Sequence, residues 1–459
     1  MELTDIDNLV ALQRNYFNIG KTRSLAVRLT HLKALYEGIT KYESKIMEAL
    51  KKDLNKSEFD SYATEIGYTL KEISHTIKHL PKWERCEKIR KTPLYLFGTK
   101  SYVMNEPYGV TLHIAPWNYP FQLAIVPIIG ALAAGNTVIL KPSELTPNVS
   151  DLLTELISEI FPKELIAVLT GGKEVSEKLL EQKFDYIFFT GSTRVGKIIM
   201  EAAAKQLTPV TLELGGKSPT IVHEDANLQL AARRIAYGKF LNAGQTCVAP
   251  DYVYVHEKIK NTFLQQLKQE ITELYGENPV ENSKMTRIVS KKHFERLVKL
   301  FENVVPIIGG KFNEETLMIS PTVLTDVTWE MPVMEEEIFG PILPVMTYKE
   351  VDEIVEKITN KPKPLALYLF TESKAIKEEI LSRISFGGGC INDTILHLTH
   401  PHLPFGGVGE SGIGRYHGKY SFETFTHQKS IMKQTTKFDI SVRYGLSEKA
   451  YKMVRKTLK

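Results

Sequence analysis

Apolar and polar positions follow a helical period through residues 5–80, where leucine, isoleucine and tyrosine recur every three or four positions and proline and glycine are scarce. This pattern predicts helices. Over residues 94–114 the sequence changes to short alternation that is rich in β-forming residues. We expect strands there, with Gly98 and Thr99 as a hairpin turn.

Short apolar runs then alternate with longer segments of helical period. We expect strands at 110–115, 137–140, 166–169, 185–189 and 209–213. We expect helices between them at 121–134, 147–160, 173–182 and 194–205. This alternation implies right-handed crossovers and a parallel sheet that helices cover on both faces. Such a sheet binds ligands at the carboxyl ends of its strands.

The alternation starts again after Glu213 and indicates a second α/β domain. Helices are expected near 227–242, 257–275 and 290–301, followed by strands near 319–324, 342–347 and 365–370. Residues 387–415 are rich in glycine, and we interpret them as a loop that returns across the molecule. The predicted fold class is therefore α/β, with a Rossmann-type domain followed by a second α/β domain.

Length, charge and cysteine content agree with an ordinary intracellular globular protein. The 459 residues exceed what one hydrophobic core usually holds. The 58 Lys and Arg against 54 Asp and Glu give a net charge of +4, which is too balanced to predict a nucleic-acid partner. Three cysteines, and an N-terminus without a secretion-signal pattern, predict a reducing, cytoplasmic location. The basic C-terminus at 449–459 is better explained by a solvated helix than by a membrane-surface patch.

Residues 121–140 are about long enough to span a bilayer. Proline, glycine and polar residues interrupt them, however, at positions Gln122, Pro127, Gly130, Gly135, Asn136 and Thr137. A buried helix that ends near Gly135, followed by a buried strand, fits this segment better. We predict no integral membrane segment.

Two segments carry candidate covalent chemistry. Cys247 lies in GQTCVAPDY, where a turn follows a helical run, and a thiol there can act as a nucleophile once it is ionised. Glu213 ends a β-rich run at a Gly-Gly turn, where a carboxylate can hold a water as general base. Taken alone, each has an ordinary explanation, a small core residue or a solvated carboxylate. That ordinary explanation holds for Cys86 and Cys390.

Other segments end predicted strands with residues suited to a nucleotide or an oxyanion. In FFTGSTRVG, Gly191 to Gly196 open a helix whose backbone N–H groups suit a pyrophosphate. Lys141 and Glu144 in LKPSE can hold ribose hydroxyls, and the Asn118 amide in PWNYP can donate to an oxyanion. EEEIFGP presents Glu337 and Phe339 in a turn before a strand.

Three histidines in HLTHPH have a conceivable metal spacing: His397, His400 and His402. No cysteine or carboxylate motif accompanies them, so a loop at the mouth of a substrate site explains them better. We predict no metal site.

Together the motifs resemble the aldehyde dehydrogenase superfamily in order and spacing. They are PWN, KPSE, FTGSTRVG, LELGGKSP, GQTC, EEEIFGP and LPFGGVGESGIGRYHGKYSFETFTHQK, and the resemblance covers about residues 5–435. CVAPDY after the cysteine and RYHGKYSFETF near the end resemble the class 3 branch, which acts on fatty and aromatic aldehydes.

The resemblance implies a role for each motif. Cys247 would be the nucleophile, Asn118 with the Cys247 backbone N–H the oxyanion hole, and Glu213 the base for deacylation. Lys141 and Glu144 would hold the adenosine ribose, and Glu337 and Phe339 the nicotinamide end. The pyrophosphate turn would be Gly191, Ser192, Thr193, Arg194, Val195 and Gly196.

The implied activity is oxidation of medium- or long-chain aliphatic or aromatic aldehydes to acids through a thiohemiacetal and a thioester. The implied cofactors are NAD and NADP, with NAD preferred because Glu144 repels a 2′-phosphate. Coenzyme-A-acylating and phosphate-using relatives, and a decayed binding protein, are the alternatives. The presence of Cys247, Glu213 and Asn118 argues against all of them.

The resemblance also implies a domain division and a homodimer. The dinucleotide-binding domain would comprise residues 1–81 and 104–213, and the catalytic domain residues 214–395. Residues 82–103 and 396–459 would form a bridging segment for subunit contacts. The substrate entrance is expected near Tyr68, Asn118, Tyr119, Ile391 and His400.

Overall fold

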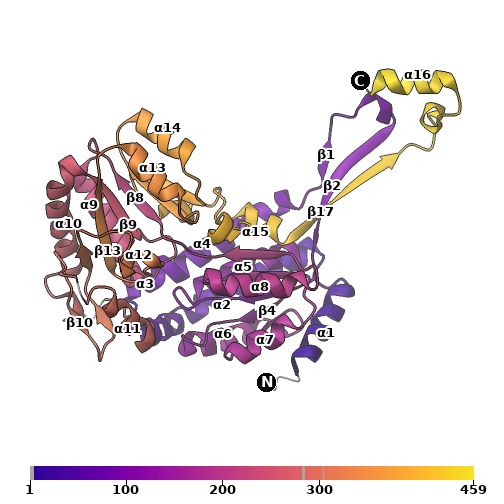
Figure 1. The fold of residues 1–459 in the computed structure, drawn as a ribbon. Helices are drawn as coiled ribbons and strands as arrows, with labels where there is room; N and C mark the ends of the chain where they lie inside the picture. Colours follow the sequence, from indigo (N-terminus) through magenta and orange to yellow (C-terminus); the bar gives the residue numbers. More distant parts are fainter. Residues whose placement is uncertain (1–4, 282–284, 303, 459) are drawn as a thin grey trace.

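The computed structural model describes residues 5–281, 285–302 and 304–458, and Figure 1 shows a broad body from which a narrow arm projects. The N-terminal part is helical, as predicted. Its elements are α1 (Asp5–Asn18), α2 (Leu25–Leu54), α3 (Glu58–Ser61), the π-helical turn η1 (Tyr62–Ile66) and α4 (Gly67–Trp83).

The first sheet has the strand order β16-β7-β6-β3-β4-β5 among the described residues. All neighbours are parallel except β16, which the glycine-rich segment adds antiparallel to β7. The strands are β3 (Val110–Ile114), β4 (Thr137–Lys141), β5 (Ile166–Val168), β6 (Tyr186–Thr190), β7 (Val210–Glu213) and β16 (Gly412–Ile413). The connecting helices are α5 (Gln122–Ala134), α6 (Pro147–Ile160), α7 (Lys173–Leu180) and α8 (Thr193–Ala204).

The direction of winding in this sheet reverses between β3 and β6, because β4 and β5 lie on one side and β6 and β7 on the other. In open α/β sheets a ligand crevice forms at such a point, outside the carboxyl ends of the strands. The Rossmann-type arrangement is confirmed, and each of its parallel strands and helices lies within a residue or two of its predicted position.

The second sheet is parallel throughout its described length, in the order β12-β13-β9-β8-β14-β15. Its strands are β8 (Pro219–Val222), β9 (Tyr252–His256), β12 (Thr322–Leu324), β13 (Ile342–Tyr348), β14 (Ala366–Phe370) and β15 (Gly388–Ile391). Its helices are α9 (Leu228–Phe240), α10 (Lys260–Tyr275), α11 (Lys291–Lys299), α12 (Pro332–Glu335), α13 (Val351–Thr359) and α14 (Lys374–Arg383). The helices α9, α11 and α14 begin where Asn227, Ser290 and Ser373 accept a backbone N–H.

The prediction of a loop over 387–415 is wrong near both ends, since residues 388–391 form β15 and residues 412–413 form β16. A glycine there lets the backbones approach closely: a Cβ at Gly389 would collide with the carbonyl oxygen of Leu367 on β14. The remaining short elements of the body are the 3-10 turns η3 (Leu241–Gly244), η4 (Glu257–Ile259), η5 (Pro279–Glu281), η6 (Leu396–Thr399) and η7 (Gly409–Ser411), the hairpin β10 (Phe312–Asn313) with β11 (Met318–Ile319), and α15 (Lys419–Thr424).

The arm is a three-stranded antiparallel sheet that ends in a small helical tip (Figure 1). Its strand order is β1-β2-β17, so strands from the two predicted bridging stretches, 82–103 and 396–459, pair with each other within the chain. Its elements are β1 (Glu87–Ile89), the turn η2 (Leu94–Leu96), β2 (Thr99–Pro107), β17 (Thr426–Gln434), η8 (Ser441–Tyr444) and α16 (Glu448–Thr457).

The two-residue turn expected at Gly98 and Thr99 is wrong. Strand β1 already ends at Ile89, and residues 90–98 form a longer connection. Pro93 lies in this connection and has no N–H to donate to a ladder. Gly98, with φ +84°, leads into β2.

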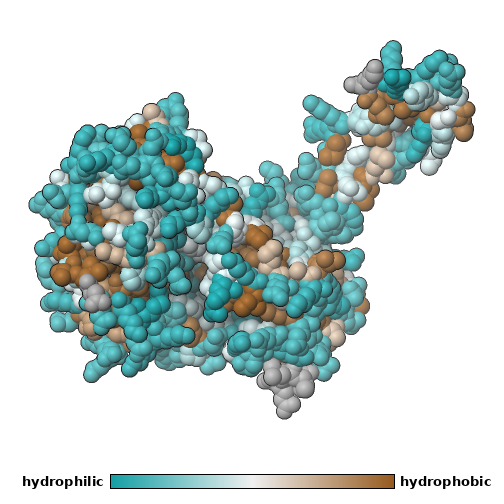
Figure 2. Space-filling view, in the orientation of Figure 1, coloured by the Kyte–Doolittle hydropathy of each residue, from teal (hydrophilic) through white to brown (hydrophobic). Residues whose placement is uncertain are grey.

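Apolar side chains are exposed at the tip of the arm, as the brown patches in Figure 2 show. They include Tyr444, Leu446, Tyr451 and Leu458, each more than half exposed. Helix α5 forms the first part of the 121–140 run, which is about long enough to span a bilayer. In contrast to the tip, this helix is buried inside the body. Within the described ranges, the chain has no helix with the length and apolar character needed to cross a membrane.

Candidate active site

Cys247 lies where two cavities meet, since it lines both of them. It follows α9 and a tight turn in which Asn242, Ala243 and Gly244 all have φ between 53° and 71°. Two consecutive non-glycine residues in the left-handed region are strained, and such strain is usually kept at functional sites. The turn presents the thiol to the cavities from an otherwise buried segment.

The loop that carries Asn118 is bonded to the loop that carries Cys247. The Asn118 side-chain amide donates to the carbonyl oxygen of Gln245 at 3.0 Å, and Asn242 donates to the carbonyl oxygen of Asn118 at 2.9 Å. The Tyr119 and Thr246 hydroxyls lie 2.7 Å apart. An amide has two N–H donors, so the second Asn118 hydrogen stays available to a reacting oxygen.

The Cys247 thiol is neutral in the resting protein. Burial, with smaller contributions from Glu337 and then Glu213, raises its pKa to about 12. The backbone N–H groups of Cys247 and Val248 act in the opposite direction. The thiolate that a nucleophile requires is therefore disfavoured until a positive charge or a donor enters the site.

Glu213 ends strand β7 and is 2% exposed. Burial raises the pKa of its carboxyl group well above the usual value, which favours the protonated form. In the part of the chain that the structure describes, neither carboxyl oxygen has a hydrogen-bond partner. A buried polar group without a partner is costly and usually has a functional reason.

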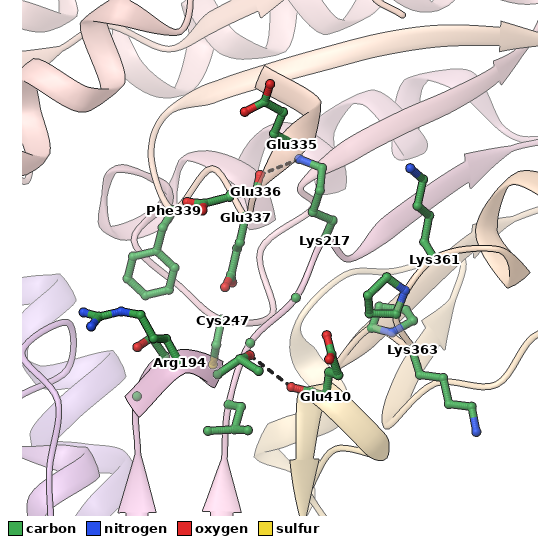
Figure 3. A pocket seen from close by; sticks show the side chains of 18 of the residues that line it. Arg194, Lys217, Cys247, Glu335, Glu336, Glu337, Phe339, Lys361, Lys363 and Glu410 are labelled. Carbon is green, nitrogen blue, oxygen red and sulfur yellow. Dashed lines mark hydrogen bonds between the residues drawn. The ribbon is translucent and has the colours of Figure 1, made fainter. Parts of the chain in front are cut away.

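The larger cavity, of 1020 Å³, is a cleft at the crevice predicted by the sheet topology. Eight predicted site residues line it: Asn118, Gly191, Ser192, Thr193, Arg194, Cys247, Glu337 and Phe339. Figure 3 shows the Glu337 side chain extending toward Cys247, with Phe339 beside it and Arg194 across the cleft. Trp117 packs edge-on against Phe339 at 5.3 Å between ring centroids.

The N-terminus of α8 opens onto this cleft. The hydroxyl of Ser192 caps the helix by accepting the N–H of Val195 at 3.4 Å. A Cβ at Gly191 would lie 2.5 Å from the Phe189 ring, and one at Gly196 would lie 2.7 Å from Leu214. The glycines therefore allow β6, α8 and β7 to approach closely, and the helix N-terminus provides N–H donors and positive potential for an anion.

Four predicted cofactor residues lie outside the described lining of the cleft: Lys141, Glu144, Val195 and Gly196. Lys141, at the end of β4, pairs with Glu144 at 2.6 Å. Val195 and Gly196 belong to the first turn of α8. Their proposed contacts with a nucleotide remain predictions.

The backbone on either side of Glu337 is held by a charged network that the sequence analysis missed. Lys217 forms an ion pair with Asp251 at 2.5 Å, and Asp251 accepts the backbone N–H of Ile338 at 2.9 Å. Burial and Asp251 raise the pKa of Glu337 to about 8. Lys217 directly follows the Gly-Gly turn and Asp251 ends CVAPD, so charged residues just before buried strands were the available signal.

The second cavity is a mainly apolar channel of 200 Å³ that reaches Cys247 and Glu213. Tyr68 and Tyr119 line it, as predicted, whereas Asn118 lines the cleft instead. Ile391 and His400 do not line either cavity in the described lining. Residues that the prediction omitted include Ala63, Thr64, Tyr237, Leu241, Leu396, Leu398, Phe405, Tyr416 and His417.

The three histidines considered for a metal point to different neighbours. The His397 ring nitrogen lies 3.6 Å from the Cys390 sulfur. His402 contacts His400 and also His75 on helix α4, at 5.8 and 5.1 Å between ring centroids. His397 therefore has different neighbours from His400 and His402, which contact each other.

The cleft lies where the winding of the first sheet reverses, and it meets the apolar channel at a cysteine. This arrangement is typical of the thiol-dependent dehydrogenases. The chain belongs to the aldehyde dehydrogenase family, whose family model matches residues 1–431. It is 51% identical over 429 residues to the 4,4′-diaponeurosporen-aldehyde dehydrogenase of Staphylococcus aureus, covering 93% of each chain. It is 46% identical over 430 residues to the dimeric NADP-preferring aldehyde dehydrogenase of Rattus norvegicus, covering 94% of this chain and 95% of that one.

A solved structure of the substrate-bound state of Staphylococcus aureus AldH has the same fold. Its TM-score is 0.96, its identity is 48%, and the match covers 99% of both chains. The family expectation and the α/β fold class from the sequence are confirmed.

Proposed function

We propose that this chain oxidises aldehydes to carboxylic acids with NAD or NADP, through covalent attack by Cys247. The observation that carries the proposal is the position of the Cys247 thiol at the junction of the nucleotide-type cleft and the apolar channel. An aldehyde in the channel and a nicotinamide in the cleft would both reach this one atom.

The residues of the cleft suit a dinucleotide. The N-terminus of α8 with Gly191 provides room and donors for a pyrophosphate. Glu337 and Phe339 are suited to the nicotinamide ribose and ring, and Lys141 and Glu144 to the adenosine ribose. Bound NAD or NADP would supply the hydride acceptor that converts the covalent adduct into a thioester.

The chain's own groups account for the remaining steps. After the thiol loses its proton, the sulfur bonds to the carbonyl carbon, and the side-chain amide of Asn118 with the Cys247 N–H stabilises the oxyanion. In the second half, Glu213 in its ionised form takes a proton from water as that water attacks the thioester. The acid leaves and the thiol is regenerated. The sum is aldehyde, NAD(P)+ and water to acid, NAD(P)H and a proton.

The channel supports medium- or long-chain aliphatic or aromatic aldehydes as substrates. Its wall is mainly aliphatic and aromatic, so each additional buried CH2 of a substrate would contribute about 0.8 kcal/mol of binding. A series of aldehydes from acetaldehyde to long-chain and aromatic compounds, followed by NAD(P)H absorbance, tests this assignment. kcat/KM should rise with chain length; highest efficiency with acetaldehyde would contradict it.

Replacing Cys247 with Ala tests the mechanism. NAD(P)H formation should fall to background, whereas Cys390→Ala should keep wild-type activity because Cys390 lies outside both cavities as described. Persistence of wild-type activity in the Cys247→Ala variant would sink the proposal. Addition of coenzyme A or phosphate should not raise the rate; dependence on either would replace hydrolysis by acyl transfer.

We propose that both cofactors are accepted and that NAD is preferred. The Glu144 carboxylate would repel a 2′-phosphate, but its ion pair with Lys141 offsets part of that charge. The expected outcome is a higher kcat/KM with NAD and a gain for NADP in Glu144→Gln. Much better activity with NADP in the unchanged protein would contradict the preference.

We also propose a homodimer formed through the arm, since its tip exposes apolar side chains that a partner could cover. Light scattering that found only monomers would contradict the dimer.

The proposed domain division places 82–103 and 396–459 in this bridging segment. Residues 1–81 and 104–213 would bind the nucleotide, and residues 214–395 would carry the nucleophile. Three free thiols support a cytoplasmic location.

A further inference from the structure

A buried ion pair lies behind the loop that carries Asn118. The Lys56 ammonium and the Glu65 carboxylate are 2.5 Å apart, and their side chains are 1% and 0% exposed. Lys56 comes just after α2, and Glu65 belongs to the π-helical turn η1. Neither residue is in the described lining of the two cavities, so neither is placed to touch a substrate or a cofactor.

Both members of the pair hold backbone or side-chain groups of the loop 118–122. The Lys56 ammonium donates to the carbonyl oxygen of Asn118 at 3.2 Å and lies 4.1 Å from the centre of the Tyr119 ring. One oxygen of Glu65 accepts the backbone N–H groups of Phe121 and Gln122, at 3.0 and 2.9 Å. These four contacts fix the segment between β3 and α5.

The Glu65 carboxylate also serves as the cap of helix α5. The N-cap residue Phe121 has no side chain that can accept a hydrogen bond, and a carboxylate at a helix N-terminus is stabilised by the helix dipole. Helix α5 is therefore anchored at the end nearest the reacting atoms by a residue from another helix.

Stability alone is a poor explanation for such a pair. Removing two charges from water costs much of what their attraction gains, and apolar replacements of buried pairs are often neutral or stabilising. A buried pair does, however, fix the groups that it contacts in one geometry. A π-helical turn is rare and is found frequently at functional sites.

We infer that Lys56 and Glu65 are positioning residues that orient the Asn118 amide for the oxyanion. This inference rests on the proposed function, in which Asn118 stabilises that oxyanion. Lys56 holds the main chain of Asn118 at its carbonyl oxygen, and Asn242 donates to the same oxygen. Loss of the lysine would remove one of the two donors to this oxygen, and the main chain of residue 118 could then shift relative to the Cys247 sulfur.

The test is a double-mutant cycle between Lys56 and Asn118. Lys56→Met keeps most of the side-chain volume and removes the charge and the donors. We expect it to lower kcat by about 10- to 100-fold, since small misplacement of an orienting group has effects of that size. KM for the cofactor should stay unchanged, because Lys56 contacts none of the residues that are proposed to bind the cofactor. In an Asn118→Ala background the same substitution should have little further effect on kcat.

Arg28→Met is the matched control. Arg28 is also buried, and it donates to the carbonyl oxygen of Ala133 near the opposite end of α5, at 2.8 Å. It should lower the midpoint of thermal unfolding and leave kcat of the folded enzyme unchanged. A merely structural role for Lys56 would give the same result as this control.

The single variant leaves Glu65 as a buried unpaired charge and could prevent folding. The double variant Lys56→Met, Glu65→Gln removes both charges and should fold, yet show the same loss of kcat. The inference is overturned if either folded variant keeps wild-type kcat, or if the loss persists undiminished in the Asn118→Ala background. If Asn118→Ala itself leaves kcat unchanged, the proposed function fails at the oxyanion step, which is a distinguishable result.

Discussion

The Glu213→Gln variant should have a higher free energy of unfolding than the native protein, and this difference should increase as pH rises. The Glu213 carboxyl is 2% exposed, and burial raises its pKa well above the ordinary value of 4.5. The folded chain thus retains a proton that the unfolded chain releases above that value. Because the unfolded state is favoured by this release, glutamine, which has a similar shape and no proton to lose, removes a destabilising contribution.

The size of the effect follows from the titration of the unfolded chain. While the folded carboxyl stays protonated, each pH unit above 4.5 lowers the free energy of unfolding by about 1.4 kcal/mol. The penalty is therefore at most about 1 kcal/mol near pH 5 and at most about 3 kcal/mol near pH 7, the upper values applying if the folded carboxyl keeps its proton throughout. The stability difference between the variant and the native chain should increase over that range by up to about 2 kcal/mol.

Urea unfolding of the cofactor-free protein, followed by tryptophan fluorescence at several pH values, measures this difference. The slope with pH is the decisive quantity, because any effect of the amide on packing adds a constant. Glu201→Gln, at an exposed position on α8, is the control for the loss of a glutamate outside the buried site. A difference that stays constant or decreases from acid to neutral pH would refute the reasoning.

Three further outcomes are expected. Alkylation of Cys247 by iodoacetamide should rise with pH without reaching a plateau below about 12, since that is its raised pKa. In the same assay Glu337→Gln should increase the rate at alkaline pH, where the Glu337 carboxyl, with its pKa of about 8, is ionised. Gly196→Ala should raise KM for the cofactor and cost about 1–3 kcal/mol of stability in chemical unfolding, because its Cβ would lie 2.7 Å from Leu214. Asn136→Ala should lower the free energy of unfolding by about 2–4 kcal/mol in the same assay. The buried Asn136 amide accepts the backbone N–H of Gly109 and donates to the carbonyl oxygen of Phe425 at the base of the arm, at 2.9 Å each.

The first sheet could be predicted closely because its signals are local. Each strand is a short apolar run between longer helical segments, so period and length both identify it; β4, for example, was expected at 137–140 and spans Thr137–Lys141. The second sheet was predicted less completely. β8 and β9 are runs of four and five residues that follow the Gly-Gly and the Cys-containing segments. They were interpreted as parts of those motifs, so no strand was predicted there.

The residues of the candidate site also fall into those that the sequence could predict and those that it could not. Motif order along the chain was sufficient to select Cys247, Asn118 and Glu337, which line one cleft. It could not reveal the Lys56–Glu65 pair, whose importance depends on contacts with a loop more than fifty positions away. No local period or motif marks a lysine as buried; only the packing of α2 and η1 against the α5 segment does so.

The electrostatic state of the site also depends on that packing. A strand end and a turn identify Glu213 and Cys247 as candidates, but their chemistry needs an ionised carboxylate and an ionised thiol, and burial raises the pKa of both groups. The same low-polarity surroundings that suit an aliphatic substrate therefore favour the protonated, inactive forms of the proposed nucleophile and base. The reactivity of the thiol must then increase with pH or when a positive charge enters the site. The neutral thiol is protected from unwanted reactions, but it is also a weaker nucleophile.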